Sequence, residues 1–111
     1  MTGLGALLAA LGVILGAFGA HALKGRLDAN DLAIFETAVR YHLIHAVAIV
    51  AIGEKFRLPA WALVVGITIF SGSLYLLVLT GQRWLGAITP IGGLSFIFGW
   101  IYLAWLALRS A

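Results

Sequence analysis

Four long apolar stretches run along the chain, separated by short polar segments. The apolar positions fall within residues 4–23, 32–53, 59–80 and 84–108. A membrane-spanning helix needs about 20 predominantly apolar residues, so each stretch is long enough to cross a bilayer. Because consecutive spans run in opposite directions, the pattern predicts an all-α polytopic membrane protein. We expect an antiparallel bundle of four transmembrane helices that forms one domain over residues 1–111.

Small residues and prolines add detail to this pattern. In the first stretch, Gly12, Gly16 and Gly19 follow one another at spacings of four and three. Small residues along one stripe let helix backbones approach closely in lipid, so this stripe is expected to pack against another helix. Pro59 suits the first turn of the third helix. Pro90 lacks a backbone N–H and predicts a kink or break early in the fourth helix.

Composition agrees with a bilayer as the surrounding solvent. Hydrophobic residues make up 63% of the chain and charged residues only 10%, whereas roughly a quarter of a soluble domain is charged. The seven Lys and Arg residues are spread over several loops, which does not make a patch for nucleic acid. The chain has no cysteine, which excludes disulfides, thiolate metal sites and Cys nucleophiles. A multi-pass protein of a cell membrane is therefore expected, with lipid as its first partner.

The second stretch begins with charges. Glu36 and Arg40 are four residues apart, in the order that favours a pair on a helix. Either the first turns of this helix lie among the lipid headgroups, or the two charges enter the membrane together. A paired charge that faces the bundle is the usual way in which such residues are tolerated. We expect Glu36 and Arg40 to form an intramembrane ion pair.

Uncharged polar residues gather in one half of the bilayer. Counting along the four spans places most of them near the side opposite the two termini. The predicted cluster contains His21, Thr37, Tyr41, His45, Ser71, Ser73, Tyr75 and Thr89. Lipid supplies no hydrogen bonds, so these side chains are expected to bond between helices. Such a cluster either holds the helices together or lines a cavity for water, a proton, a lipid headgroup or a small ligand.

Metal binding and hydrolysis are two further functions that residues in this region suggest. His42 and His45 lie three apart, and together with His21 they are the residues of a transition-metal or haem site. No carboxylate or Cys completes a strong ligand motif, so no metal and no cofactor are expected. Ser71 or Ser73 beside a histidine would suit a hydrolase, but the sequence has no nucleophile elbow. The chain is therefore expected not to be an enzyme.

Several ordered motifs give the chain a family resemblance. They are residues 16–21 (GAFGAH), Thr37 with Tyr41 and His45, residues 70–75 (FSGSLY), and Thr89-Pro90 with Gly92-Gly93, Phe96 and Gly99-Trp100. In this order they resemble the YgdD-type family, related to transmembrane protein 256 of animals and described as domain of unknown function 423. The resemblance implies four spans in the bacterial inner membrane or in organelle membranes, with no established biochemical activity. Many members carry Gln where this chain has His42, which weakens a metal site at that residue.

Charges leave the orientation open. Each side of the membrane has three basic residues: Lys55, Arg57 and Arg109 with the termini, and Lys24, Arg26 and Arg83 opposite. The positive-inside rule therefore gives no preference, and the family resemblance implies cytoplasmic termini. We expect a structural, accessory or interaction component that forms a homo-oligomer or binds another membrane protein. The alternatives are a small transporter, channel or lipid or cation binder that uses a polar cavity, and a haem- or metal-binding protein.

Overall fold

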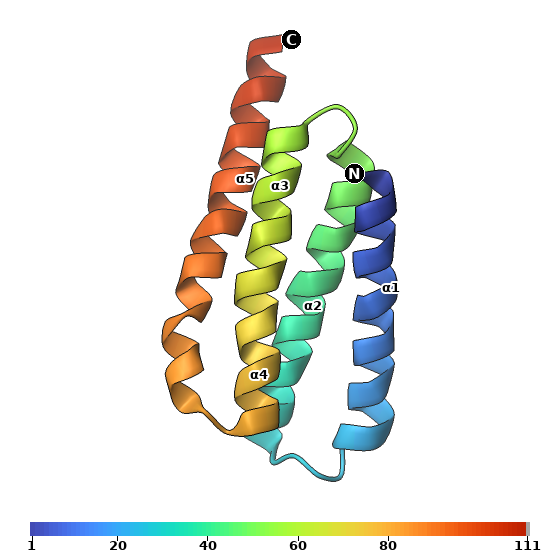
Figure 1. Cartoon of the computed structure of the whole chain (residues 1–111), viewed down its shortest axis with the longest axis vertical. Coiled ribbons are helices and arrows are strands. Elements are labelled where there is room, and N and C mark those ends of the chain that lie inside the picture. The colour runs from blue at the N-terminus through green and yellow to red at the C-terminus, as the bar shows by residue number, and fades with distance from the viewer. Residues whose placement is uncertain (111) are drawn as a thin grey trace.

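The computed structural model describes residues 1–110, which form helices joined by short turns and contain no strand (Figure 1). The first span is α1 (Thr2–Phe18) followed by a π-helical turn, η1 (Gly19–Leu23), and the second is α2 (Ala29–Ile52). The third joins α3 (Arg57–Gly66), the π-helical turn η2 (Ile67–Ser71) and α4 (Gly72–Thr80). The fourth consists of a 3₁₀ turn, η3 (Arg83–Ala87), and α5 (Thr89–Ser110). All four are long and apolar enough to cross a membrane, which confirms the predicted fold class.

The four spans form a flattened row (Figure 1). Across the molecule the order is α1, α2, α3 with α4, and α5, and the principal extents are 49 × 26 × 16 Å. Accordingly, α1 packs mainly on α2, and α5 packs mainly on α3 and η2. The start of α1 and the end of α5 lie at the same end of the long axis of the bundle, here called the terminal end, and the turns after η1 and α4 lie at the opposite end (Figure 1). One side of α2 therefore remains uncovered between α1 and α5.

Local chemistry sets the helix ends. The Asp28 carboxylate accepts a hydrogen bond of 2.7 Å from the backbone N–H of Asp31, which caps the start of α2. Gly81 ends α4 in the left-handed conformation (φ 75°), which glycine adopts without steric cost. The break expected near Pro90 is present, because the fourth span changes from a 3₁₀ turn to an α-helix immediately before Thr89. Pro90 thus occupies the first turn of α5, where its missing N–H does least harm.

Close approach at glycines fixes the outer helices to the inner ones. A Cβ added to Gly12 would come within 2.7 Å of Leu43, so the predicted small stripe of α1 does face α2. A Cβ on Gly92 of α5 would overlap the backbone nitrogen of Phe70. Two apolar clusters of buried residues fill the rest of the interior. They are Leu23, Phe35, Leu77, Val78 and Leu85 toward the opposite end, and Ala46, Ile49, Leu63, Ile67 and Phe96 toward the terminal end. Buried polar groups lie between them.

Candidate functional site

His42 lies at the centre of the interior and joins three helices. Its side chain belongs to α2 and is 1% exposed. The ring Nε2 lies 2.7 Å from the carbonyl oxygen of Leu8 in α1, and Nδ1 lies 2.8 Å from the hydroxyl of Tyr75 in α4. A carbonyl only accepts hydrogen bonds, so Nε2 carries the proton and donates it. In the neutral ring, Nδ1 then accepts from Tyr75, whose hydroxyl can either donate or accept.

His45 joins α2 to α5 and is held in the opposite tautomer. Its Nδ1 lies 2.7 Å from the carbonyl oxygen of Tyr41, so Nδ1 carries the proton. Its Nε2 accepts a bond of 3.0 Å from the indole N–H of Trp100, which can only donate. The ring also stacks on Phe96 with 3.7 Å between centroids. A charged His45 would turn a second donor toward Trp100, so this arrangement favours the neutral ring.

Hydroxyl groups make the remaining interhelical bonds. Ser71, which ends η2, donates to the carbonyl oxygen of Ala38 at 2.8 Å. Ser73 of α4 and Thr89 of α5 are hydrogen-bonded to each other through their hydroxyls. Within the part of the chain that the structure describes, no buried side-chain nitrogen or oxygen lacks a partner. The interior is therefore fully bonded, as a bilayer environment requires.

The predicted cluster divides into separate bonded groups. Ser73 with Thr89, and His45 with the Tyr41 backbone, form two of these groups, while Ser71 bonds only to backbone. His21 is exposed on η1, and Thr37 is half-buried; neither makes a side-chain hydrogen bond within residues 1–110. The prediction that every residue of the cluster bonds between helices is therefore wrong for His21 and Thr37.

His42 and Trp100 are the residues that the predicted cluster missed. The four-residue spacing of Thr37, Tyr41 and His45 indicates a helix face that neighbours the face of His42. Its spacing of seven from Phe35 and from Ile49, both buried, marks His42 as a residue of the inner face. Trp100 belongs to one of the ordered motifs, and its indole N–H donates a hydrogen bond to His45.

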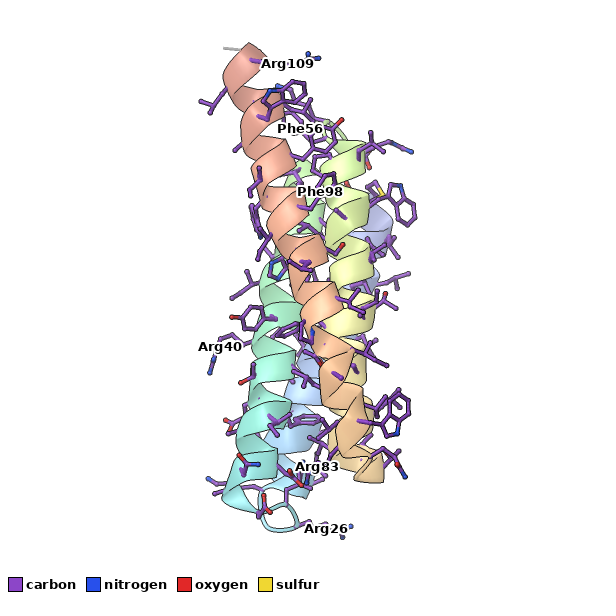
Figure 2. All side chains as sticks on the ribbon, turned by 90° about the vertical axis from the view of Figure 1, so that its left-hand side faces the viewer. Arg26, Arg40, Phe56, Arg83, Phe98 and Arg109 are labelled. Carbon is purple, nitrogen blue, oxygen red and sulfur yellow. The ribbon has the colours of Figure 1, made fainter. Side chains whose placement is uncertain are left out.

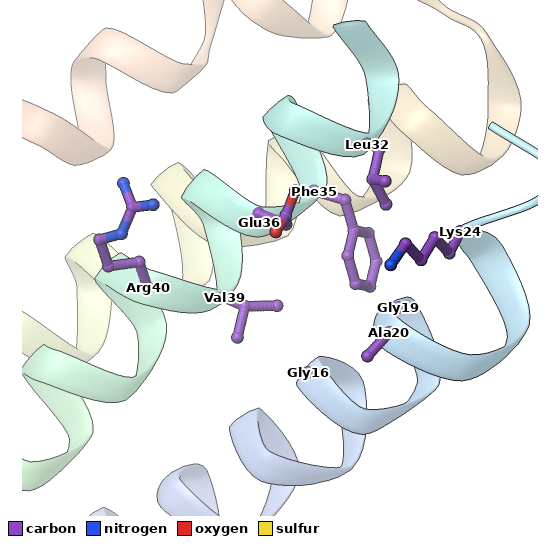
Figure 3. A pocket seen from close by; sticks show the side chains of 9 residues that line it. All are labelled: Gly16, Gly19, Ala20, Lys24, Leu32, Phe35, Glu36, Val39 and Arg40. Carbon is purple, nitrogen blue, oxygen red and sulfur yellow. The ribbon is translucent and has the colours of Figure 1, made fainter. Parts of the chain in front are cut away.

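Glu36 and Arg40 do not form the expected ion pair. Among residues 1–110, the salt bridges are those of the Met1 amine with Glu54 and of Asp31 with Arg83. Glu36 and Arg40 are both exposed on α2, and their side chains do not approach each other in Figure 3. Arg40 also lines the groove between α2 and α5, whereas Glu36 lines only the groove between α1 and α2. The two side chains therefore differ in the grooves that they line, although both lie on the exposed side of α2.

Glu54 joins the start of α1 to the segment after α2 at the terminal end. Its carboxylate accepts hydrogen bonds from the backbone N–H and the hydroxyl of Thr2 and from the Met1 amine, at 3.1 to 3.2 Å. The hydrogen bond from the Thr2 backbone, followed by that from the Met1 amine, lowers the pKa of Glu54 to about 2. Glu54 therefore remains charged at any physiological pH and holds the start of α1 to the end of α2.

Two grooves flank Arg40 on the uncovered side of α2. The groove between α1 and α2 measures about 430 Å³, and Lys24, Phe35 and Glu36 lie along it (Figure 3). The groove between α2 and α5 measures about 500 Å³ and reaches Tyr41 and His45. Neither groove contains His21, which lies on the exposed side of its turn.

The histidines are not arranged for a metal. His42 and His45 already use their unprotonated nitrogens as acceptors for Tyr75 and Trp100. Within the described residues, no group of three or more His, Cys, Asp or Glu side chains could hold a metal ion. The geometry gives no support to the haem- or metal-binding alternative.

Fold and interior together define a small four-span helical membrane protein whose buried polar groups are satisfied between its own helices. The model of the family described as "Protein of unknown function (DUF423)" matches residues 15–93, so the chain belongs to this family. The match includes most of the motifs behind the family resemblance, which is confirmed. Every relative reported below is named a membrane protein, and the chain accordingly lies in a lipid bilayer of the cell.

Relatives of this chain cover nearly its whole length. It is 46% identical to the UPF0382 membrane protein of Staphylococcus haemolyticus, over 90% of this chain and 88% of that one. It is 45% identical to a UPF0382 membrane protein of Staphylococcus epidermidis, over 97% and 94% of the two chains. The UPF0382 membrane protein YwdK of Bacillus subtilis is 40% identical over 96% and 94%. No solved structure matches the chain.

Proposed function

We propose that this chain is a non-enzymatic component of a membrane assembly and binds a protein partner through the outer face of α2. The outer face consists of the α2 residues on the uncovered side of the row: Ala33, Glu36, Thr37, Arg40, Ile44, Val47 and Ala51. The observation that carries the proposal is the exposure of two opposite charges on this face, inside a span, with no ion partner among residues 1–110.

Arg40 lies close to the middle of the membrane. It is 11 residues after the first residue of α2 (40 − 29) and 12 before the last (52 − 40). At 1.5 Å per residue it is therefore about 17 Å from either end of the helix. Figure 2 shows Arg40 projecting away from the ribbons at a level between Arg83 at one end and Phe56 at the other. An unpaired arginine at the centre of a span costs about 2.5–3.5 kcal/mol on insertion scales.

A partner that supplies opposite charges would offset this cost. The interior contrasts with the outer face, because each of its buried polar atoms has a partner in the same chain. Among residues 1–110, only the outer face of α2 thus combines membrane depth with charges that have no ion partner. This difference favours association with another protein over an isolated monomer in lipid.

The absence of catalysis is part of the proposal. Ser71 and Ser73 would be the nucleophiles of a hydrolase, but their hydroxyls are bound to the Ala38 carbonyl and to Thr89. The histidines are bound to Tyr75 and Trp100 in the same way. These bonds connect helices, and interhelical bonding accounts for all of these side chains without a reaction.

A second candidate function is binding of a lipid headgroup. The groove between α1 and α2 carries Lys24 and Glu36, which offer charges of both signs to a zwitterionic headgroup (Figure 3). Gly16, Gly19 and Ala20 form the α1 side of the same groove and present it with small residues. In this second candidate function, a lipid molecule, and not a protein, binds at the charged face of α2.

We further propose the bacterial inner membrane as the location, with both termini in the cytoplasm. The family resemblance supports this orientation, and the equal number of basic residues on the two sides does not oppose it. The test is labelling of Thr2→Cys and Asn30→Cys in intact cells with a membrane-impermeant maleimide. Asn30→Cys should react and Thr2→Cys should not; the reverse result would refute the orientation.

The proposed function is tested with a photo-crosslinking amino acid at Ile44, on the outer face. Val65 of α3 is the matched control, since it is also exposed and lies within a span. Irradiation in native membranes should give a protein adduct from position 44 and only lipid adducts from position 65. Lipid adducts alone from both positions would contradict a protein partner and favour the second candidate.

A further inference from the structure

We infer that the partner is a second copy of this chain, and that the outer faces of α2 join two copies in a parallel, two-fold symmetric dimer. The inference rests on the proposed function, because it names the partner of the same face. It depends on three features of α2: the spacing of the exposed residues, their charges, and the open space beside them.

Six residues of the outer face, all of them exposed except the half-buried Thr37, follow a coiled-coil period. Their numbers increase in alternating steps of four and three: Ala33, Thr37, Arg40, Ile44, Val47 and Ala51. Apolar positions that repeat every 3.5 residues form the seam between two packed helices. Alanine near each end lets the two backbones approach closely in lipid. The single charge in this seam, Arg40, is placed like the polar residues that set register in coiled coils.

Glu36 and Arg40 make the face complementary to itself. In a parallel pair, Glu36 of one copy lies about 6 Å along the axis from the level of Arg40 in the other. A long arginine side chain can cover this offset, as do the oppositely charged residues that flank coiled-coil seams. Two-fold symmetry repeats the contact, so two ion pairs form and the four charges cancel.

The space beside α2 leaves room for the second copy. Arg40 lines both the groove toward α1 and the groove toward α5, so it stands on a ridge between them. Neither neighbouring helix therefore covers the seam. In the groove toward α5, Gly93 lines the wall beside Ile44, where it adds no side chain.

A parallel arrangement keeps both copies level in the membrane. An antiparallel pair with Glu36 level with Arg40 has its axis at residue 38, whereas the middle of α2 lies between residues 40 and 41. The copies would then be displaced by about 7.5 Å across the bilayer. A parallel pair has no such displacement, and it agrees with one orientation for every copy.

The dimer is tested by disulfide crosslinking in native membranes. The chain has no cysteine, so single-cysteine variants report one position each. Ala33→Cys and Val47→Cys should each form dimers on oxidation, because facing positions of the seam come within disulfide reach. Val65→Cys, on an exposed part of α3, is the matched control and should form none.

Charge variants connect the dimer to Glu36 and Arg40. In the Val47→Cys background, Arg40→Glu should lower the crosslinked fraction about tenfold, because it puts four acidic groups at the seam. The double change Glu36→Arg with Arg40→Glu exchanges the charges and should restore the crosslink. Restoration also shows that the variants fold. A loss in Arg40→Glu without restoration in the folded double variant would overturn the charge pairing.

The remaining outcomes separate this inference from the proposed function. Crosslinks between Ala33→Cys and Ile44→Cys, which are almost level in the antiparallel pair, without dimers of either alone, would reveal that pair and overturn the parallel dimer. No crosslink at either position, with an adduct to a different protein from position 44, would overturn self-association and leave the proposed function intact. No crosslink together with lipid adducts alone would overturn both.

Discussion

The inner and outer faces of α2 differ in how their polar groups are satisfied. On the inner face, His42 and His45 are buried, and every ring nitrogen has a partner in the same chain. On the outer face, Glu36 and Arg40 are exposed and have no ion partner within residues 1–110. Within residues 1–110, the buried polar groups are therefore satisfied, whereas the two charges of the outer face have no ion partner. Changes to the interior should act on folding, and changes to the outer face should act on association.

The largest effect is expected where the interior is packed most closely. A Cβ at Gly92 would overlap the backbone of Phe70, which cannot turn aside as a side chain can. Gly92→Ala should therefore lower the free energy of unfolding in detergent by about 3 kcal/mol, as overpacking does. Gly93→Ala is the matched control, since its Cβ would meet Phe70 at an ordinary 3.8 Å. Equal unfolding curves for the two variants would contradict the close contact between η2 and α5.

The second largest effect is expected at His42. His42→Leu keeps the volume of the side chain but leaves the Tyr75 hydroxyl without its partner. An unsatisfied buried group of this kind costs about 2 kcal/mol, which unfolding by denaturant in detergent can measure. The double variant His42→Leu with Tyr75→Phe removes both partners of this bond and should recover most of that cost. If His42→Leu were as stable as the native chain, the bonds of His42 would not support the bundle.

A change at Arg40 should affect association and not the stability of the monomer, in contrast to a change at His42. Arg40→Leu removes an exposed charge that has no ion partner in the chain, so the free energy of unfolding of the monomer in micelles should change by less than about 0.5 kcal/mol. The same variant should lose association in native membranes. A loss of monomer stability equal to that of His42→Leu would remove the distinction between the two faces.

The smallest effect concerns Glu54, a satisfied charge in water at the terminal end. Folding lowers its pKa from an ordinary value near 4.5 to about 2. A lowered pKa stabilises the fold at pH values above 4.5, and this contribution is lost as the pH falls through 2. The native chain should therefore lose more stability than Glu54→Gln when an unfolding series is taken from pH 5 to pH 2. Parallel curves for the two chains would contradict the bonds to Thr2 and Met1.

Much of the fold follows from hydrophobic pattern alone. The four spans and the small-residue stripe that contains Gly12 each depend on residues close in sequence, whose helical geometry is known in advance. The candidate site could not be predicted from local pattern alone, because it is formed by contacts between helices. Counting along a span gives the depth of a side chain, but the rotation of one helix against another decides which side chains meet.

His21 and His42 illustrate this limit. His21 has the expected depth, but it comes two residues after Gly19, which packs on Phe35 of α2, and it therefore lies on the opposite, exposed side. The depth of His42 could also be counted, but its partners, the Leu8 carbonyl and the Tyr75 hydroxyl, come from helices far apart in sequence. The i to i+4 spacing of Glu36 and Arg40 permitted an ion pair, but the two side chains line different grooves.

The most direct test of an occupied outer face is the access of dissolved oxygen to spin labels in native-like bilayers. Labels would be placed at Ile44 and Val47 on the outer face and at Val65 as the control, all within membrane spans. Oxygen concentrates in the lipid core, so a label that faces lipid relaxes faster. We expect low oxygen access at positions 44 and 47 and high access at position 65. Equal, high access at all three positions would contradict the account, because it would show that lipid covers the outer face of α2.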